Sequence, residues 1–205
     1  MEQARQPVLR GERLILRELV PADTPALFRL MSDPAVMRYW SRTPFTDVWE
    51  AAELIEAIRL DTAAGALWEW ALESKEGDGL IGTCTLHHLN PRHRRAEIGC
   101  ALTPGQWGHG LMREAMALVI THTFADPASG GLGLERIEAD TDPRNTATLS
   151  LLKRLGFRAE GLLRRRWCVA GAWSDSAIFG LLRAEWTEAG ARDLHPGLPP
   201  GKGRE

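Results

Sequence analysis

Three closely spaced glycines within residues 105–112 separate the apolar residues 96–102 from a stretch that meets no helix breaker before Asp126 and Pro127. This order predicts a strand, a tight turn and the beginning of a helix. The first N–H groups of a helix have no partner within the helix, and the helix dipole adds partial positive charge at that end. Such a turn binds anions, most often phosphate groups. We therefore expect residues 105–112 to bind a phosphorylated small molecule.

One acidic side chain, Glu97, interrupts the apolar run before this turn. A carboxylate is costly to bury without a partner, so Glu97 must face solvent, an ion-pair partner or a cleft. Arg94 and Arg95 are near enough along the chain to be that partner. Two interpretations follow: a carboxylate in a cleft that is available for proton transfer, or a solvated, salt-bridged glutamate.

Histidines cluster within residues 87–93, and the three cysteines are Cys84, Cys100 and Cys168. Neither group has the regular spacing of a metal site, so we expect no metal and interpret the histidine segment as a polar loop. Two of the cysteines lie in apolar, strand-like runs. We expect the cysteines to be buried, reduced thiols of a cytoplasmic protein.

The composition is that of an ordinary globular protein. The 205 residues suit one domain, with 44% hydrophobic and 25% charged residues. A net charge of −2 argues against a nucleic-acid-binding protein, which would be clearly basic. No apolar run approaches the roughly 18 residues of a membrane span, and residues 1–5 lack the apolar core of a signal peptide. We therefore expect a cytoplasmic protein that contacts neither membrane nor nucleic acid.

The pattern of apolar residues and breakers predicts a mixed order of elements. Strands are expected at residues 14–19, 67–73, 80–87, 96–103 and 136–141, and a closing hairpin at 163–169 and 174–182. Helices are expected from Asp23, as its cap, to 31, and at 48–60, 111–125 and 146–155.

This order is typical of an α+β domain with one mixed sheet. The glycine spacing differs from the dinucleotide-binding motif, and no Gly-Lys-Ser/Thr follows to form a P-loop. Residues 1–187 are expected to form the domain. Residues 188–205, rich in Pro, Gly and charged residues, are expected to be a flexible tail.

Several motifs together resemble those of the GCN5-related N-acetyltransferase (GNAT) superfamily. They lie at residues 107–115, at 145–148 followed by 151–157 and 160–161, at 9–17, and at 171–175. In this order, over about residues 8–187, they are similar to the RimJ/RimL-type ribosomal-protein N-terminal acetyltransferases. The resemblance implies a mixed, mostly antiparallel, twisted sheet flanked by helices and splayed between its fourth and fifth strands, residues 96–103 and 136–141.

The resemblance also implies acetyl-CoA as co-substrate, with no metal. The residues that it assigns to CoA binding are Cys100, Ala101, Leu102, Trp107, Gly108, His109, Gly110, Leu111, Met112 and Asn145. The N–H of Ala101 or Leu102 is expected to face the thioester oxygen. Asn145 is also suited to a turn or a helix N-cap, which is compatible with that role. Trp107 and Met112 depart from the family pattern, but backbone N–H groups, which any residue supplies, hold the pyrophosphate.

For catalysis, the resemblance implies that Glu97 is the general base that deprotonates the amine. Leu152 occupies the position where many relatives carry a tyrosine that protonates the leaving thiolate, and Tyr39 is far away in sequence. Thr148 keeps a hydroxyl where the RimL-like branch has serine, so it is the expected acid. Trp40 lies in the segment that forms the acceptor wall in relatives.

The choice of acceptor depends on the pKa of the amine. An α-amine with a pKa near 8 costs only about 1 kcal/mol to deprotonate at pH 7, whereas a lysine side chain costs roughly 4.5 kcal/mol. A site with one carboxylate and no tyrosine therefore favours the N-terminal α-amine of a protein. Two alternatives stay open: a small-molecule amine such as an amino acid, polyamine or antibiotic, and a non-catalytic acyl-CoA-binding module. A homodimer is possible.

Overall fold

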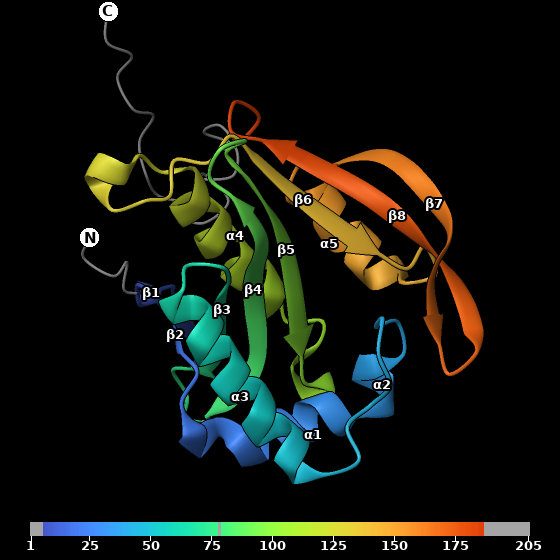
Figure 1. Ribbon diagram of the computed structural model, residues 1–205. Coiled ribbons are helices and arrows are strands. Elements are labelled where there is room, and N and C mark those ends of the chain that lie inside the picture. Colours follow the sequence, from blue (N-terminus) through green and yellow to red (C-terminus); the bar gives the residue numbers. More distant parts are fainter. Residues whose placement is uncertain (1–5, 78, 187–205) are drawn as a thin grey trace, which may run out of the picture.

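The computed structural model describes residues 6–77 and 79–186, which form one eight-stranded sheet with helices on both faces (Figure 1). The expected tail at 188–205 lies outside the described residues. The strands are β1 (Leu9–Arg10), β2 (Leu14–Glu18), β3 (Trp68–Ser74), β4 (Leu80–Asn90), β5 (Arg95–Leu102), β6 (Arg136–Thr141), β7 (Arg158–Val169) and β8 (Ala172–Leu182). The helices are α1 (Thr24–Ser32), α2 (Pro34–Met37), α3 (Val48–Ala63), α4 (Leu111–Phe124) and α5 (Thr146–Arg154). Short 3₁₀ turns lie at Pro21–Asp23, Pro104–Gln106 and Pro127–Ser129.

The strand order is β1-β2-β3-β4-β5-β6-β8-β7, and every neighbouring pair is antiparallel except β5 with β6. The predicted α+β fold with one mixed, mostly antiparallel sheet is confirmed. The structure adds β1 and α2 to the expected elements, continues β4 to Asn90 and begins β7 at Arg158. The single-turn helix α2 forms because the Asp33 side chain accepts a hydrogen bond from the Ala35 N–H, and Pro34 suits a first helical position.

Local hydrogen bonds explain how the first long helices begin. The Asp47 carboxylate accepts from the Trp49 N–H, and Glu50 reaches back to the Asp47 N–H, which forms a capping box at the start of α3. The expected side-chain cap by Asp23 at α1 is wrong. Its carboxylate instead pairs with Arg17 at 2.8 Å, because the guanidinium of β2 offers a stronger, charged partner.

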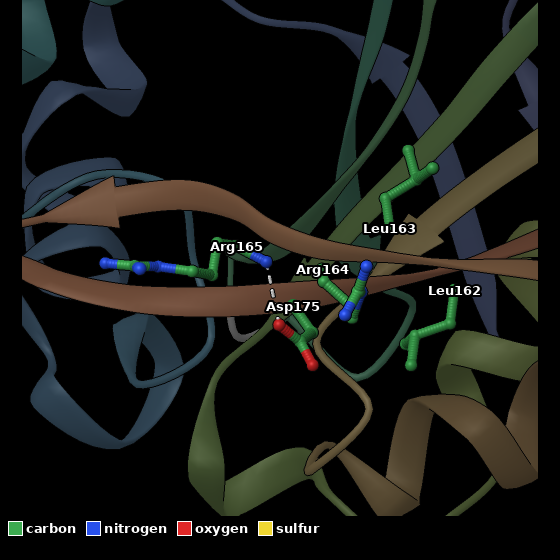
Figure 2. Close-up of a pocket in the computed structure, with 5 residues that line it drawn as sticks. All are labelled: Leu162, Leu163, Arg164, Arg165 and Asp175. Carbon is green, nitrogen blue, oxygen red and sulfur yellow. Dashed lines mark hydrogen bonds between the residues drawn. The ribbon is translucent and has the colours of Figure 1, made fainter.

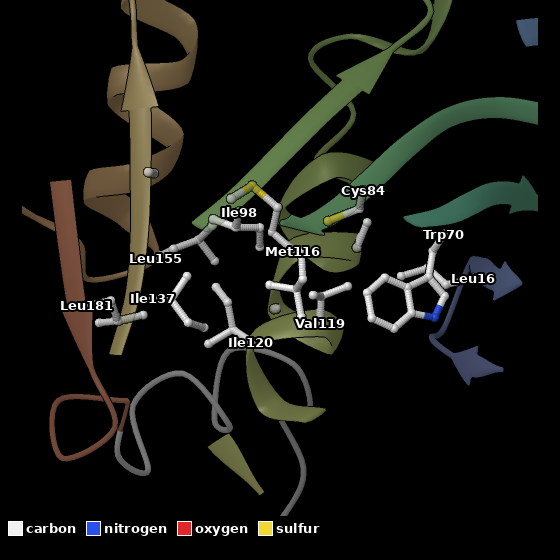
Figure 3. Close-up of a cluster of buried hydrophobic side chains, with 14 of the residues drawn as sticks. Leu16, Trp70, Cys84, Ile98, Met116, Val119, Ile120, Ile137, Leu155 and Leu181 are labelled. Atoms are coloured by element: carbon white, nitrogen blue, oxygen red, sulfur yellow. The ribbon is translucent and has the colours of Figure 1, made fainter. Parts of the chain in front are cut away.

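Two hydrophobic cores cover opposite faces of the sheet. One packs α4 and α5 against the sheet around Trp70, Met116, Ile120 and Ile137, which are each at most 2% exposed (Figure 3). The other packs α1 and α3 against the sheet and includes Ala101 of β5. The alternation of side chains along each strand divides the apolar residues between these cores.

The parallel pair β5–β6 separates soon after it forms. Only Arg95, Ala96 and Glu97 of β5 have partners on β6, namely Arg136, Ile137 and Glu138. Beyond this point β5 stays paired with β4, and β6 stays paired with β8 as far as Thr141. The two strands therefore diverge, which confirms the predicted splay between them.

The environments of the three free cysteines differ. Cys84 is buried, Cys100 is partly buried and Cys168 is exposed on β7. The expectation of a buried thiol is wrong for Cys168, because β7 is an edge strand whose side chains are almost all exposed. Among the described residues, no helix is long and apolar enough to cross a membrane.

Glu69 on β3 provides a test of buried charge in this fold. Burial raises the pKa of its carboxyl to about 7, although hydrogen bonds from Thr83 and Thr85 oppose this effect. Between pH 4.5 and about 7 the folded protein keeps a proton that the unfolded chain has released, so the free energy of unfolding should fall as pH rises. We expect Glu69→Gln to remove this slope and to stabilise the protein at pH 8 by at most about 3 kcal/mol.

Urea denaturation at several pH values measures this effect. Glu76→Gln, in an exposed turn, is the matched control and should retain the wild-type slope. Equal pH slopes for Glu69→Gln and wild type would show that Glu69 is already ionised in the folded protein.

Candidate active site

A cavity of about 240 Å³ lies where β5 and β6 diverge. Its walls come from the segment after α2, from β4, β5 and β6, from α5, and from the β7–β8 hairpin. Five of the side chains expected at the site line it together: Trp40, Glu97, Cys100, Asn145 and Thr148. The fold thus unites residues that lie far apart in the sequence.

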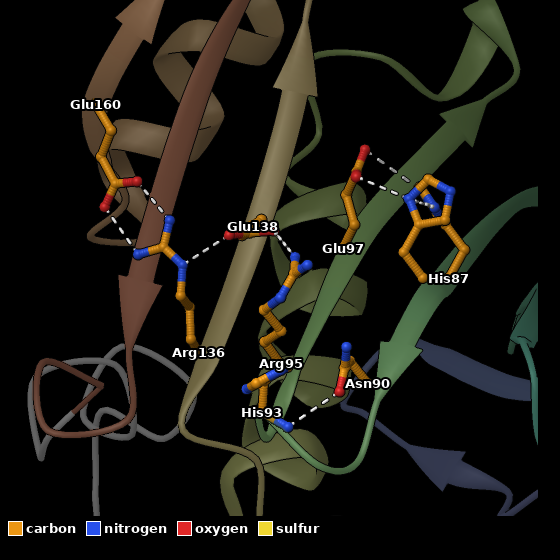
Figure 4. Close-up of polar contacts among 9 residues, drawn as sticks. His87, Asn90, His93, Arg95, Glu97, Arg136, Glu138 and Glu160 are labelled. Atoms are coloured by element: carbon orange, nitrogen blue, oxygen red, sulfur yellow. Dashed lines mark hydrogen bonds and ion pairs between the residues drawn. The ribbon is translucent and has the colours of Figure 1, made fainter.

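Glu97 contacts two histidines of β4 rather than its arginine neighbours. Its Oε2 lies 3.1 Å from His88 Nδ1, and its Oε1 lies 3.8 Å from His87 Nε2 (Figure 4). Arg94 pairs with Glu135 and Arg95 with Glu138, so the expected salt bridge of Glu97 to these arginines is wrong. The Glu97 side chain is 23% exposed, and its carboxylate is accessible from the cavity.

An irregularity in β4 brings both histidines to Glu97. The pairing of β4 with β5 shifts between His87 and Asn90, and His88 has a φ of 50°. In a regular strand consecutive side chains point to opposite faces, whereas a bulge can turn both to one side. The expectation of a polar loop at 87–93 is therefore wrong for His87 and His88, which belong to a strand and face the site.

Charged residues close the narrow end of the splay. Arg95 of β5 donates to Glu138 of β6 at 2.6 Å, and Arg136 Nε donates to the same carboxylate at 2.9 Å (Figure 4). Arg136 also pairs with Glu160 of β7, and these hydrogen bonds raise the pKa of its guanidinium further above the normal value. The network joins β5, β6 and β7 below the cavity.

Asn145 forms the predicted helix cap, and Thr148 supplies the N–H group that it caps. The Asn145 Oδ1 accepts from the Thr148 N–H at 3.1 Å and caps α5. Both residues also line the cavity. The cap engages only the Asn145 oxygen, so its amide nitrogen remains a donor that can serve a ligand.

The chain's single tyrosine, Tyr39, lines the same cavity. No motif in the sequence marks Tyr39 as a site residue, and it is far along the chain from the candidate catalytic residues. Leu152, at the position of the tyrosine of many relatives, also lines the cavity and is 1% exposed. The hydroxyl-bearing residues Tyr39 and Thr148 therefore line this space, together with Ser41, Thr141 and Ser174.

Cys100 is poorly suited to act as a nucleophile at neutral pH. Burial raises the pKa of its thiol to about 12, and a thiol at neutral pH stays protonated under this condition. The site thus favours direct attack on a bound electrophile over a covalent cysteine intermediate.

The register of β5 decides which backbone groups face the splay. The Thr103 N–H donates to the Ile81 carbonyl, and the alternation of an antiparallel ladder then directs the Ala101 N–H toward β4. The N–H groups of Cys100 and Leu102 point the opposite way, toward the splay. Of the two groups expected to face a thioester oxygen, Ala101 is therefore excluded and Leu102 is retained.

The glycine turn forms the expected helix start. Gly108 and Gly110 have φ values of 80° and 76°, a region that glycine adopts readily, and Gly110 is the N-cap of α4. A glycine cap has no side chain to engage the first N–H groups of the 14-residue helix, so these groups can bind an anion. Trp107, Gly108, His109 and Gly110 are exposed, while Leu111 is buried and Met112 is partly buried. These residues do not line the cavity.

Sequence reasoning missed an ion pair that holds this turn. The buried Glu114 accepts from Arg13 Nε at 2.9 Å and from the Arg13 backbone N–H at 2.8 Å. Arg13 Nη1 also donates to the His109 carbonyl at 2.7 Å. The Trp107 indole donates to the Leu102 carbonyl at 2.7 Å, which ties the turn to the end of β5. Arg13, which directly precedes β2, thus adds positive charge beside the helix start.

A bulge in β7 shapes the opposite wall. Leu163 pairs with Ser176 and Trp167 with Ser174, so the residues between them protrude, and the Arg165 N–H donates to Asp175 at 2.8 Å (Figure 2). Trp167 then lines the cavity.

Comparisons with known proteins agree with this geometry. Residues 13–158 match the acetyltransferase (GNAT) domain family. The chain is 38% identical over 178 residues to an uncharacterized N-acetyltransferase, p20, of Bacillus licheniformis, covering 87% of this chain and 97% of that protein. It is 26% identical over 162 residues to the spermidine N(1)-acetyltransferase of Escherichia coli K12, covering 78% and 81% of the two chains. RimJ of Mycobacterium smegmatis, solved in complex with CoA-disulfide, shares the fold, with a TM-score of 0.81 at 24% identity over 96% of this chain and 98% of that chain.

The contacts of Arg13 predict a role in binding CoA, the ligand expected at the turn. We expect Arg13→Gln to weaken CoA binding about tenfold, because one charge-assisted partner of the turn is lost. Isothermal titration calorimetry measures the Kd, with Arg10→Gln on exposed β1 as the control. An unchanged Kd with a lowered free energy of unfolding would limit Arg13 to a structural role.

Proposed function

The chain belongs to the GNAT family of acetyltransferases, and from this premise we propose that it transfers the acetyl group of acetyl-CoA to the N-terminal α-amine of a protein, as the RimJ/RimL-type enzymes do. The observation that carries the proposal is the meeting of Glu97, Asn145 and Thr148 in one cavity at the splay of β5 and β6. A carboxylate and a hydroxyl in one cavity can move protons in both directions, which a module that only binds acyl-CoA does not require.

The donor side of the proposed site follows from the open backbone groups. The pyrophosphate of acetyl-CoA is assigned to the N–H groups of the turn at Gly108, Gly110 and Leu111, next to the Arg13 guanidinium. The pantetheine arm is assigned to the free edge of β5 beyond Glu97, with the Asn145 amide as a side-chain donor. This arrangement fits the pyrophosphate because the glycines of the turn leave the backbone N–H groups uncovered by side chains.

In the proposed reaction, Glu97 accepts a proton from the amine, directly or through water. The amine nitrogen forms a bond to the thioester carbon, and the Leu102 N–H stabilises the oxygen that becomes negative. The carbon–sulfur bond then breaks, and the Thr148 hydroxyl protonates the leaving thiolate. The second proton that the nitrogen loses as it becomes an amide restores the Thr148 hydroxyl. Tyr39 also brings a hydroxyl group to the lining of the cavity.

The size of the cavity favours an acceptor that inserts only its terminal group. Its volume of about 240 Å³ suits a terminal amine and its first groups rather than a large ligand. Its wall at Trp167 continues onto the exposed β7–β8 hairpin, where Arg165 lies over the Trp173 ring at 4.9 Å. This exposed surface is available to the polypeptide that follows an N-terminal residue.

A polyamine is the second candidate acceptor, and the charge of the cavity favours it. Glu97, Asp140 and Asp142 line the cavity, although Arg144 pairs with Asp142 at 2.6 Å and Arg166, which also lines the cavity, lies 3.9 Å from Asp140. Carboxylates beside aromatic rings bind protonated amines. The relative named as a spermidine acetyltransferase supports the same candidate.

Release of free CoA thiol over a panel of acceptors tests the proposal. We expect turnover with short peptides that carry a free N-terminus, and none with the same peptides blocked by N-terminal acetylation. The comparison acceptors are spermidine, which tests a polyamine, and an N-terminally blocked peptide with one lysine, which tests a lysine side chain. Faster turnover of spermidine than of any peptide would replace the proposed acceptor, and CoA binding with no turnover on the whole panel would favour the binding module.

Substitutions of the proposed catalytic residues test their roles separately. We expect Glu97→Gln to lower kcat about 100-fold at pH 7, within the usual range for loss of a general base, and to leave the Kd for CoA unchanged. The loss should shrink as pH rises past about 8, because the α-amine then deprotonates unaided. Thr148→Ser should retain activity that Thr148→Val loses, with Tyr39→Phe as the comparison. Equal kcat for Glu97→Gln and wild type would remove Glu97 from the mechanism.

A further inference from the structure

His87, His88 and Glu97 direct one donor atom each toward a common point at the rim of the cavity. One ligand atom from each residue lies within 4.8 Å of the other two, the one such group among the residues that the structure describes. Their chemistry is two imidazoles and one carboxylate, a donor set that binds zinc in proteins. We propose that these three residues form a binding site for a divalent transition-metal ion, with Zn²⁺ as its representative.

The distances between the donor atoms fit this ion. With zinc–ligand bonds of about 2.0–2.1 Å, neighbouring ligands of a tetrahedral site lie about 3.3 Å apart. His87 Nδ1 lies 3.2 Å from His88 Nδ1, and His88 Nδ1 lies 3.1 Å from Glu97 Oε2. The 3.8 Å separation between His87 Nε2 and Glu97 Oε1 involves other atoms of these two residues. One donor atom from each of the three residues lies within 4.8 Å of the other two, so binding of an ion requires a side-chain rotation.

Without a cation, the single proton or lone pair of His88 Nδ1 must be shared between two partners. His88 Nδ1 lies within hydrogen-bond distance of both a ring nitrogen and a carboxylate oxygen, yet a ring nitrogen carries at most one proton. A cation can accept lone pairs from all three residues at once. The carboxylate of Asp140, which also acts on His87 electrostatically, adds negative charge nearby.

The backbone builds the site at a local cost. His88 adopts a left-handed conformation that is uncommon for residues other than glycine, and this turns its ring to the side of His87. His88 is 73% exposed, so an ion can enter from solvent, and positions beyond the three protein ligands remain open to water.

If Glu97 is the base, a bound ion must inhibit the enzyme, and this consequence rests on the proposed function. The ion would engage the lone pairs that otherwise accept the amine proton. The proposed site is therefore inhibitory.

Calorimetric titration of the chelator-treated full chain with Zn²⁺ tests the site, and the visible spectrum of bound Co²⁺ reports its ligands. We expect one Zn²⁺ per chain, with binding weakened at least tenfold in His88→Gly, which fits the left-handed backbone, and in His87→Ala. His93→Ala is the matched control and should bind as wild type does. If either His88→Gly or His87→Ala fails to fold, the other variant still tests the site.

The outcomes separate the two proposals. Absence of Zn²⁺ binding by the wild type, or equal affinity of wild type and both histidine variants, would overturn the metal site, whether or not the protein transfers acetyl groups. Zn²⁺ binding by a protein that acetylates no amine would keep the site and remove the proposed function. Zn²⁺ inhibition of wild type and of His93→Ala, but not of His88→Gly relative to its own metal-free rate, would support both.

Discussion

The brief parallel pairing of β5 with β6 is the constraint on which the rest of the structure depends. Each strand keeps its other neighbour, β4 or β8, so separation costs hydrogen bonds only along one edge of each strand. Arg95 and Glu138 hold the narrow end together. Above them the edge of β5 presents the N–H groups of Cys100 and Leu102 to the opening, and a β-strand with a free edge readily binds an extended ligand.

This opening connects features that belong to different faces of the sheet. The side chains of Glu97 and Ala101 lie on the face that α1 and α3 cover, whereas those of Ile98 and Cys100 face α4. A cavity lined by Glu97 from one face and by Ile98 and Cys100 from the other therefore passes between the strands. A donor bound near the start of α4 and an acceptor from the other face can meet there without sharing an entrance.

Irregularities of the backbone in β4 and β7 place charged and aromatic side chains at the cavity. Glu97 has two histidine partners because β4 is irregular at His88, and Trp167 reaches the cavity because β7 bulges before it. Each irregularity costs some regular pairing, and each re-aims a side chain that a regular strand would direct elsewhere. The irregularity of β4 at His88 makes possible both the proposed environment of the base Glu97 and the proposed metal site.

The sequence by itself determined the local structure, because glycine spacing, apolar periodicity and helix breakers act over a few residues. It identified the turn at Gly108 and Gly110 and nearly all strands and helices, and it singled out Glu97 as a candidate for chemistry. Only the tertiary structure decided which distant groups meet: Arg13 with Glu114, His88 with Glu97, and Tyr39 with the cavity. These contacts depend on strand register and on one non-glycine residue with positive φ, and register is a property of paired strands that no single segment encodes.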